Sequence, residues 1–236
     1  MMKTLIVVTS AAALDAEHPT GVWLEEYAIP FTALCAAGIQ LTVASPQGGQ
    51  GPIDPKTAPD ADAAARWKEA LAALADTRPL AQVAGEDFDA LFLPGGHGPL
   101  VDLAGDARLA ELAGRMADEG KIVAAVCHGA AGLLAARRAD GHALVEGRKL
   151  TAFTNGEETL AGLQAVVPFL LETKLREAGA VFEHALLPGA CHVTQDGLLI
   201  TGQNPASSEA VARSLMEALA ERQRAALTAE TEPAPA

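Results

Sequence analysis

The stretch Ile122-Val123-Ala124-Ala125-Val126-Cys127-His128-Gly129 decides the fold and indicates where chemistry takes place. Its apolar half is typical of a strand buried on both faces, and the small residues from Gly129 to Ala136 predict a helix. A strand that turns sharply into a helix needs small side chains two positions either side of the turning residue, here Ala125 and Gly129 around Cys127. At such a turn the sulfur lies beside the first N–H groups of a helix, where partial positive charge favours a thiolate. The pattern therefore predicts a nucleophile at Cys127.

The other two cysteines lack this setting. Cys35 lies on the apolar face of a predicted helix that ends at Gly38, so we expect it to serve packing. Cys191 neighbours a histidine but has no strand-turn-helix context, and we interpret it as structural or incidental.

Outward from Cys127, short runs of Val, Ile, Leu and Ala alternate with longer segments of helical period. This alternation predicts an α/β fold with a mostly parallel central sheet and helices on both faces. The predicted strands are 5–8, 41–44, 90–93, 122–126, 150–153, 181–186 and 198–201. Asp106 is expected to cap one helix that ends at Gly120, and Asn204 with Pro205 to begin the last helix, which continues through Leu219.

Residues 1–224 are predicted to form a single domain, because apolar runs are spread along most of the 236 residues. Residues 46–80 interrupt the alternation with a Gly- and Pro-rich segment and then an amphipathic helix over 60–75, so we expect an insertion over the sheet edge. The tail 225–236 contains too little apolar surface to fold and is predicted to be disordered.

Composition excludes several classes of partner. The net charge of −13, without a cluster of Lys or Arg, argues against nucleic acid and against anionic membranes. No apolar run approaches the roughly 20 residues that cross a bilayer. Three cysteines do not make a disulfide framework, and the first residues enter a strand without a signal-peptide layout, so a cytoplasmic location is expected.

Ligands of open parallel sheets bind beyond the carboxyl ends of the strands, and polar residues follow several strands here. The Gly-rich turn from Pro94 to Gly98 follows one strand, and the Gly96 N–H together with that of His128 is expected to form an oxyanion hole. An isolated Gly-Gly turn more often binds nothing.

Acidic residues in two segments could complete a site. Glu157 or Glu158 could orient the His128 ring, and Glu25 or Glu26 could exchange a proton with the thiol. In each pair an acid at a helix start could instead serve only the helix dipole. His97, His128 and Glu26 lack close metal-ligand spacing, so no metal is expected.

Together these segments resemble the DJ-1/PfpI superfamily, and within it the Hsp31-like glutathione-independent glyoxalases, also described as type 1 glutamine amidotransferase-like. The resemblance covers about residues 3–219 and is carried by residues 20–23 with Glu26 and Pro30, residues 93–98, 126–129, 153–158, 196–197 and 201–207. Ala130 stands where the family often has proline.

The resemblance implies a flavodoxin-like three-layer sandwich in which Cys127 is the nucleophile and His128 lies beside it. The resemblance also implies an acid near the thiol, and the distance between Pro30 and the family's glutamate identifies it as Glu26 rather than Glu25. The following Thr159-Leu160 favours Glu158 as the third triad member, with Glu157 one residue away. His97 and Trp23 are expected to line the substrate site together with Gly96 and His128.

The activity that the resemblance implies is conversion of methylglyoxal or similar 2-oxoaldehydes to 2-hydroxy acids such as lactate, through a Cys127 hemithioacetal, in the manner of a glyoxalase III lyase of the D-lactate dehydratase class. No metal, nucleotide or glutathione cofactor is expected, and the partner is a small aldehyde; a homodimer is plausible. Two alternatives remain. One is an amidase or peptidase with the same residues, and the other is a redox-sensing or chaperone stress protein.

Overall fold

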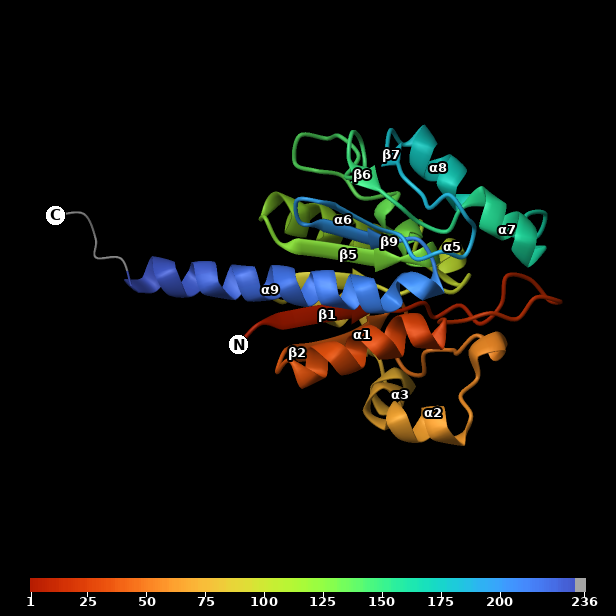
Figure 1. The fold of residues 1–236 in the computed structure, drawn as a ribbon, viewed down its shortest axis with the longest axis horizontal. Coiled ribbons are helices and arrows are strands. Elements are labelled where there is room, and N and C mark those ends of the chain that lie inside the picture. Colours follow the sequence, from red (N-terminus) through yellow and green to blue (C-terminus); the bar gives the residue numbers. More distant parts are fainter. Residues whose placement is uncertain (232–236) are drawn as a thin grey trace.

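The computed structural model describes residues 1–231 and places a seven-stranded sheet at the centre of the molecule (Figure 1). The strand order is β3-β2-β1-β4-β5-β9-β8. All neighbours are parallel except β8, which runs antiparallel to β9 at one edge. The strands are β1 (Lys3–Val7), β2 (Gln40–Ser45), β3 (Arg78–Pro79), β4 (Ala90–Leu93), β5 (Ile122–Val126), β8 (Val193–Asp196) and β9 (Leu199–Gly202).

The central strands are buried on both faces, as their continuous apolar sequences predict. Every residue of β4 and β5 is buried, and Phe92 pairs with Ala124 in parallel register. Alternate residues enter two different cores: Leu91 and Leu93 face one, whereas Phe92 faces the other. Because helices cover both faces of the sheet, polar side chains that could bind a ligand are found at the ends of the strands.

Helices cover each face of the sheet. On one face α1 and the long α9 pack against each other, and α3 packs beside α1 (Figure 1). On the other face lie α4, α5 and α6. Their bounds are α1 (Leu24–Ala36), α2 (Ala61–Arg66), α3 (Lys68–Ala75), α4 (Leu80–Val83), α5 (Pro99–Asp102), α6 (Ala107–Asp118), α7 (Asn155–Ala161), α8 (Leu171–Glu177) and α9 (Ser208–Thr231), with 3-10 helices η1 (Pro55–Thr57), η2 (Cys127–Leu133) and η3 (Pro205–Ser207). The predicted flavodoxin-like α/β fold is confirmed.

The predicted strands 150–153 and 181–186 do not join the central sheet. Only β6 (Lys149–Leu150) and β7 (Val181–Phe182) form, and they pair with each other as a separate two-stranded sheet. An edge of the central sheet is formed instead by β8, a mostly polar strand in which only Thr194 is buried, as suits an antiparallel strand at a sheet edge.

Two predicted helices differ in detail. The helix expected after Cys127 is the 3-10 helix η2, whose glycines favour α-helix poorly and allow its backbone to approach Leu93 closely. The helix expected over 60–75 is divided into α2 and α3, because the chain leaves helical geometry at Trp67, whose side chain packs on the core around α1. Residues 78–79 of the expected insertion join the sheet as β3.

The last helix is longer than predicted. α9 runs to Thr231, past residue 225, where the sequence predicts a disordered tail. Its Glu, Arg, Gln and Ala residues are good helix formers, and an existing helix extends at the cost of one residue per hydrogen bond, without a new core. Residues 232–236 lie outside the described part of the chain. Among residues 1–231, no helix is both long and apolar enough to span a bilayer.

Candidate active site

Cys127 lies at a sharp turn between β5 and η2, at the carboxyl end of the sheet. Its φ of 56° makes it the one non-glycine residue with positive φ among residues 1–231. Such a backbone is strained for an L residue and is characteristic of functional sites. Gly129 makes the turn possible, because a Cβ there would lie 2.1 Å from the Leu93 carbonyl oxygen. The small residue predicted at this position is thus required by close backbone packing.

His128 connects the thiol to a carboxylate. Its Nδ1 lies 3.4 Å from Cys127 Sγ, and its Nε2 lies 2.8 Å from Oε2 of Glu158, near the start of α7. Burial raises the pKa of Glu158, but hydrogen bonds from His128 and His97 outweigh this effect and lower it to about 2. An ionised carboxylate only accepts hydrogen bonds, so His128 Nε2 donates and its Nδ1 presents a lone pair to the sulfur.

Glu157 and Glu158 have separate partners. Glu157 Oε2 accepts hydrogen bonds from the backbone N–H and the hydroxyl of Thr154, which forms a capping box at the start of α7. Its Oε1 accepts from Gly189, Gln203 and Asn204. Glu158 is the member of the pair that contacts His128. The sequence left open which of the two acids contacts His128. In the structure Glu157 binds the neighbouring loops and Glu158 contacts the imidazole.

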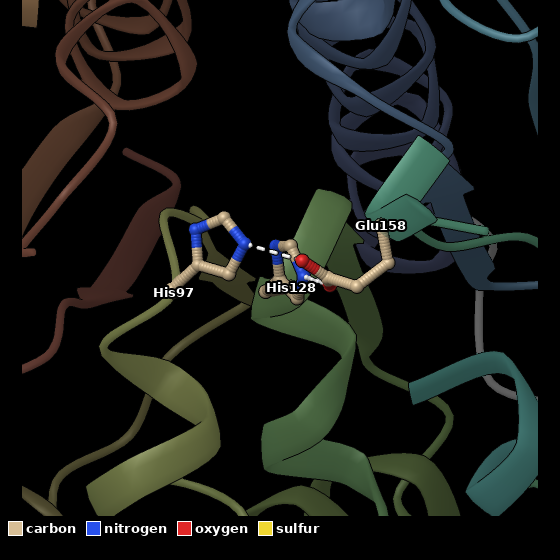
Figure 2. A group of neighbouring side chains, drawn as sticks. All are labelled: His97, His128 and Glu158. Atoms are coloured by element: carbon tan, nitrogen blue, oxygen red, sulfur yellow. Dashed lines mark hydrogen bonds and ion pairs between the residues drawn. The ribbon is translucent and has the colours of Figure 1, made fainter. Parts of the chain in front are cut away.

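A second histidine shares the same carboxylate. His97 Nε2 lies 2.9 Å from Glu158 Oε1, and the rings of His97 and His128 lie side by side with centroids 4.1 Å apart and planes tilted by 38° (Figure 2). The Phe153 ring packs against both imidazoles, with its centroid 4.5 Å from that of His128 and 6.1 Å from that of His97. We predicted that His97 lines the substrate site. Its contact with Glu158 was not predicted, because the two residues are 61 positions apart in the sequence.

Glu26 is fully buried in α1 and faces the thiol. Its Oε2 accepts a hydrogen bond of 2.9 Å from the Gly95 N–H, whereas its Oε1 has no hydrogen-bond partner among the described residues. Gly95 is needed here because a Cβ would lie 2.5 Å from Glu26 Oε2 and 2.9 Å from Cys127 Cβ. Glu25 is only partly buried, so Glu26 is the acid that the fold brings to Cys127.

Protonation states follow from this burial. Desolvation raises the pKa of Glu26 to about 8, although the Cys127 thiol and the Gly95 N–H partly oppose it. Burial first, and then the Glu26 carboxyl, raise the pKa of Cys127 well above its ordinary value. Burial followed by the neighbouring His97 lowers the pKa of His128 to about 4. The direction of these shifts opposes the expected thiolate, because burial favours the uncharged form of each group: the Cys127 thiol, the His128 imidazole and the Glu26 carboxyl.

The Gly-rich turn lies beside Cys127 as expected, but the predicted contacts of Gly96 and Trp23 are only partly formed. Gly96 has a φ of 91°, and a Cβ there would collide with the Gly21 carbonyl oxygen, 2.1 Å away. Its N–H makes no hydrogen bond among residues 1–231, and the His128 N–H interacts with the Cys127 sulfur. Trp23 meets this turn through its backbone, since its N–H donates to the Gly95 carbonyl.

A cavity of about 240 Å³ adjoins the site. His97 forms part of its wall, together with Thr20 and the apolar residues Leu14 and Leu163. Cys127 itself is 4% exposed. The other cysteines lie elsewhere: Cys35 is half-buried on α1, and Cys191 is exposed.

Fold and site together define a class, the flavodoxin-like α/β proteins that present a cysteine on a strained turn after a central strand. Residues 19–218 match the DJ-1/PfpI family, and the chain belongs to it. It is 33% identical to the bovine (Bos taurus) glutamine amidotransferase-like class 1 domain-containing protein 1, over 89% of this chain and 91% of that protein. It is 29% identical to the glutathione-independent glyoxalase HSP31 of Saccharomyces cerevisiae, over 85% and 90%.

A solved structure agrees with these relatives. The crystal structure of glyoxalase III from Candida albicans superimposes with a TM-score of 0.85 and 25% sequence identity, covering 92% of this chain and 97% of that one. The resemblance to the Hsp31-like branch that the sequence motifs indicated is confirmed by these comparisons.

Proposed function

We propose that the protein is a glutathione-independent glyoxalase that converts methylglyoxal or a similar 2-oxoaldehyde to a 2-hydroxy acid. Relatives across most of the chain carry this name, and a glyoxalase III shares the fold. The observation that carries the proposal is the thiol of Cys127 between a neutral imidazole at 3.4 Å and the buried Glu26. Because the protein supplies its own thiol, the reaction needs no glutathione.

In the first step the Cys127 sulfur adds to the aldehyde carbon. His128 Nδ1 takes the thiol proton as the C–S bond forms, so the thiolate exists only during attack. Glu158 stabilises the imidazolium through Nε2. The N–H groups of Gly96 and His128 stabilise the negative charge that develops on the carbonyl oxygen. The imidazolium then returns its proton to this oxygen, which becomes the hydroxyl of a hemithioacetal.

In the second step a proton moves between the two carbons of the adduct. Removal of hydrogen from the former aldehyde carbon gives an enediol, and protonation of the neighbouring carbon gives the thioester of a 2-hydroxy acid. The base that removes this hydrogen is His128 or Glu26. A pKa of about 8 leaves a fraction of Glu26 ionised near neutral pH, and the carboxylate returns the proton that it takes from one carbon to the neighbouring one. Water then hydrolyses the thioester, which releases lactate and restores the thiol.

The test is incubation of the purified protein with methylglyoxal without glutathione, with D- and L-lactate measured separately. Lactate formed in proportion to enzyme supports the proposal. Methylglyoxal consumption without lactate, or no consumption at all, would overturn it. The product stereochemistry then tests the narrower assignment to the D-lactate dehydratase class.

The two alternatives predict other readouts. An amidase or peptidase with the same residues would release amine from small amides or peptides. A sensor would require an exposed thiol of low pKa, and Cys127 is buried with a raised pKa. These properties favour a thiol that is activated only when a substrate is bound.

A further inference from the structure

The Glu158 carboxylate lies between two imidazoles, and the proposed mechanism uses only one of them. His128 Nε2 contacts one oxygen at 2.8 Å, and His97 Nε2 contacts the other at 2.9 Å (Figure 2). The three side chains come from different segments, after β4, after β5 and from α7, and all are buried. The arrangement therefore contains one imidazole, that of His97, beyond those that a Cys-His-Glu triad requires.

These three groups are ligands that transition metals prefer. Two imidazole nitrogens and one carboxylate form the protein ligand set of many zinc sites that keep a fourth position open. The ligand atoms lie within 4.8 Å of one another. In a tetrahedral zinc site the ligand atoms are about 3.3 Å apart, so the two nitrogens and the carboxylate need to approach by no more than about 1.5 Å.

A route for an ion from solvent leads to the same residue. His97 belongs both to this cluster and to the wall of the 240 Å³ cavity. That wall also carries Glu17 and Asp54, beside one cation, Lys56. The chain as a whole has a net charge of −13, which raises the local concentration of cations.

We propose that a zinc ion binds to Nε2 of His97, Nε2 of His128 and the Glu158 carboxylate, and that it reversibly inhibits the enzyme. Water from the cavity side supplies the fourth ligand. The ion is not a cofactor of the reaction, since it occupies the groups that the proposed chemistry needs.

Inhibition follows from the position of one proton. Neutral His128 has a single ring N–H, which is on Nε2 when that atom donates to Glu158. When zinc takes the Nε2 lone pair, the ring proton is on Nδ1, the nitrogen that faces Cys127 Sγ. Nδ1 is then a donor and cannot accept the thiol proton. Zinc thereby removes the base while it leaves the sulfur unligated.

Metal binding is best measured in the Cys127→Ala variant, where activity plays no part and the reactive thiol is absent. We expect this variant to bind one equivalent of Co²⁺, with the visible absorption bands of a tetrahedral nitrogen and oxygen site, and Zn²⁺ to displace it. Adding His97→Asn or Glu158→Gln lowers the affinity by about tenfold or more.

The matched control is His142→Asn in the same background. His142 also faces a glutamate, Glu146, at 3.1 Å, but the pair is exposed and includes none of the proposed ligands. Its loss is expected to leave Co²⁺ affinity unchanged. Far-UV circular dichroism verifies folding, and Glu158→Gln carries the test should His97→Asn fail to fold.

Several results would overturn the proposal. They are absence of Co²⁺ binding to Cys127→Ala, equal affinity in the His97→Asn and Glu158→Gln variants, or binding that requires Cys127 and shows a sulfur-to-cobalt charge-transfer band. The inhibitory role rests on the proposed function and is read separately, as loss of turnover with Zn²⁺ and its recovery with EDTA. Absent turnover with intact Co²⁺ binding would reject the glyoxalase and retain the metal site.

Discussion

Glu157 and Glu158 are adjacent in sequence, yet their carboxylates belong to separate hydrogen-bond networks. Glu157 binds Thr154 and the loop residues Gly189, Gln203 and Asn204, whereas Glu158 binds the two imidazoles of His97 and His128. Glu157 holds the start of α7 in place, and Glu158, on the same helix, is thereby positioned to contact the two imidazoles. Substitutions at the two sites are therefore expected to separate stability from activity.

Glu158→Gln is expected to lower kcat about a hundredfold or more, because the amide no longer balances the imidazolium of His128. Glu157→Gln is expected to lower the free energy of unfolding by about 1–3 kcal/mol, since it leaves buried donors poorly paired. Lactate assays and urea unfolding of both variants provide the measurement. Equal kcat values for the two variants would contradict the assignment.

Cys127→Ala is expected to abolish lactate formation, a loss of at least about a thousandfold in kcat. Cys35→Ala is the control, because Cys35 is half-buried on α1 and contributes only packing. It should retain activity near that of the wild type. Comparable activity in both variants would reject Cys127 as the nucleophile.

Glu26 is expected to make stability depend on pH. Its pKa rises from 4.5 in the unfolded chain to about 8 in the folded one, so the folded state holds the proton more tightly. This contribution is complete below pH 4.5 and is lost as pH rises toward 8, at up to about 1.4 kcal/mol per pH unit. Urea unfolding at pH 5 and pH 8 measures it.

Glu26→Gln removes the titrating group while it preserves the shape of the side chain. The wild type is expected to lose stability relative to this variant between pH 5 and pH 8, and the variant to fold but turn over slowly. A wild-type stability that stays constant relative to the variant over this range would show that Glu26 is ionised when buried.

Gly129→Ala tests the close packing behind the nucleophile. The new Cβ would lie 2.1 Å from the Leu93 carbonyl oxygen, a backbone atom of the buried strand β4, so the free energy of unfolding is expected to fall by about 3 kcal/mol or more. Gly105→Ala is the control, because a Cβ there meets no atom within 4 Å. We expect it to change stability by less than about 1 kcal/mol. Similar thermal midpoints for both variants would contradict the packing argument.

Patterns of short range predicted most of the fold. The apolar run before Cys127 and its small flanking residues located the central strand and the turn, because burial on both faces and steric crowding leave few alternatives. Strands that depend on distant partners were predicted poorly. β6 and β7 pair only with each other, across about 30 residues, and nothing local in Val181 to Leu186 indicates where pairing ends.

In the site, too, some features were predicted from the sequence and others depend on the whole fold. The family resemblance favoured Glu26 and Glu158 over their neighbours, and both lie against the expected partners, Cys127 and His128. The protonation of Cys127 was not predictable, since a helix terminus alone suggests a lowered pKa. Full burial beside Glu26 has the opposite and larger effect, and burial depends on the whole fold.

The left-handed backbone at Cys127 also bears on how the sequence can change over time. Glycine would adopt a φ of 56° without strain, whereas an L side chain costs about 1–2 kcal/mol there. Random substitution filtered for folding alone would therefore drift toward glycine at this position. Relatives that have lost the chemistry are therefore expected to carry an unstrained residue, such as glycine, at this turn.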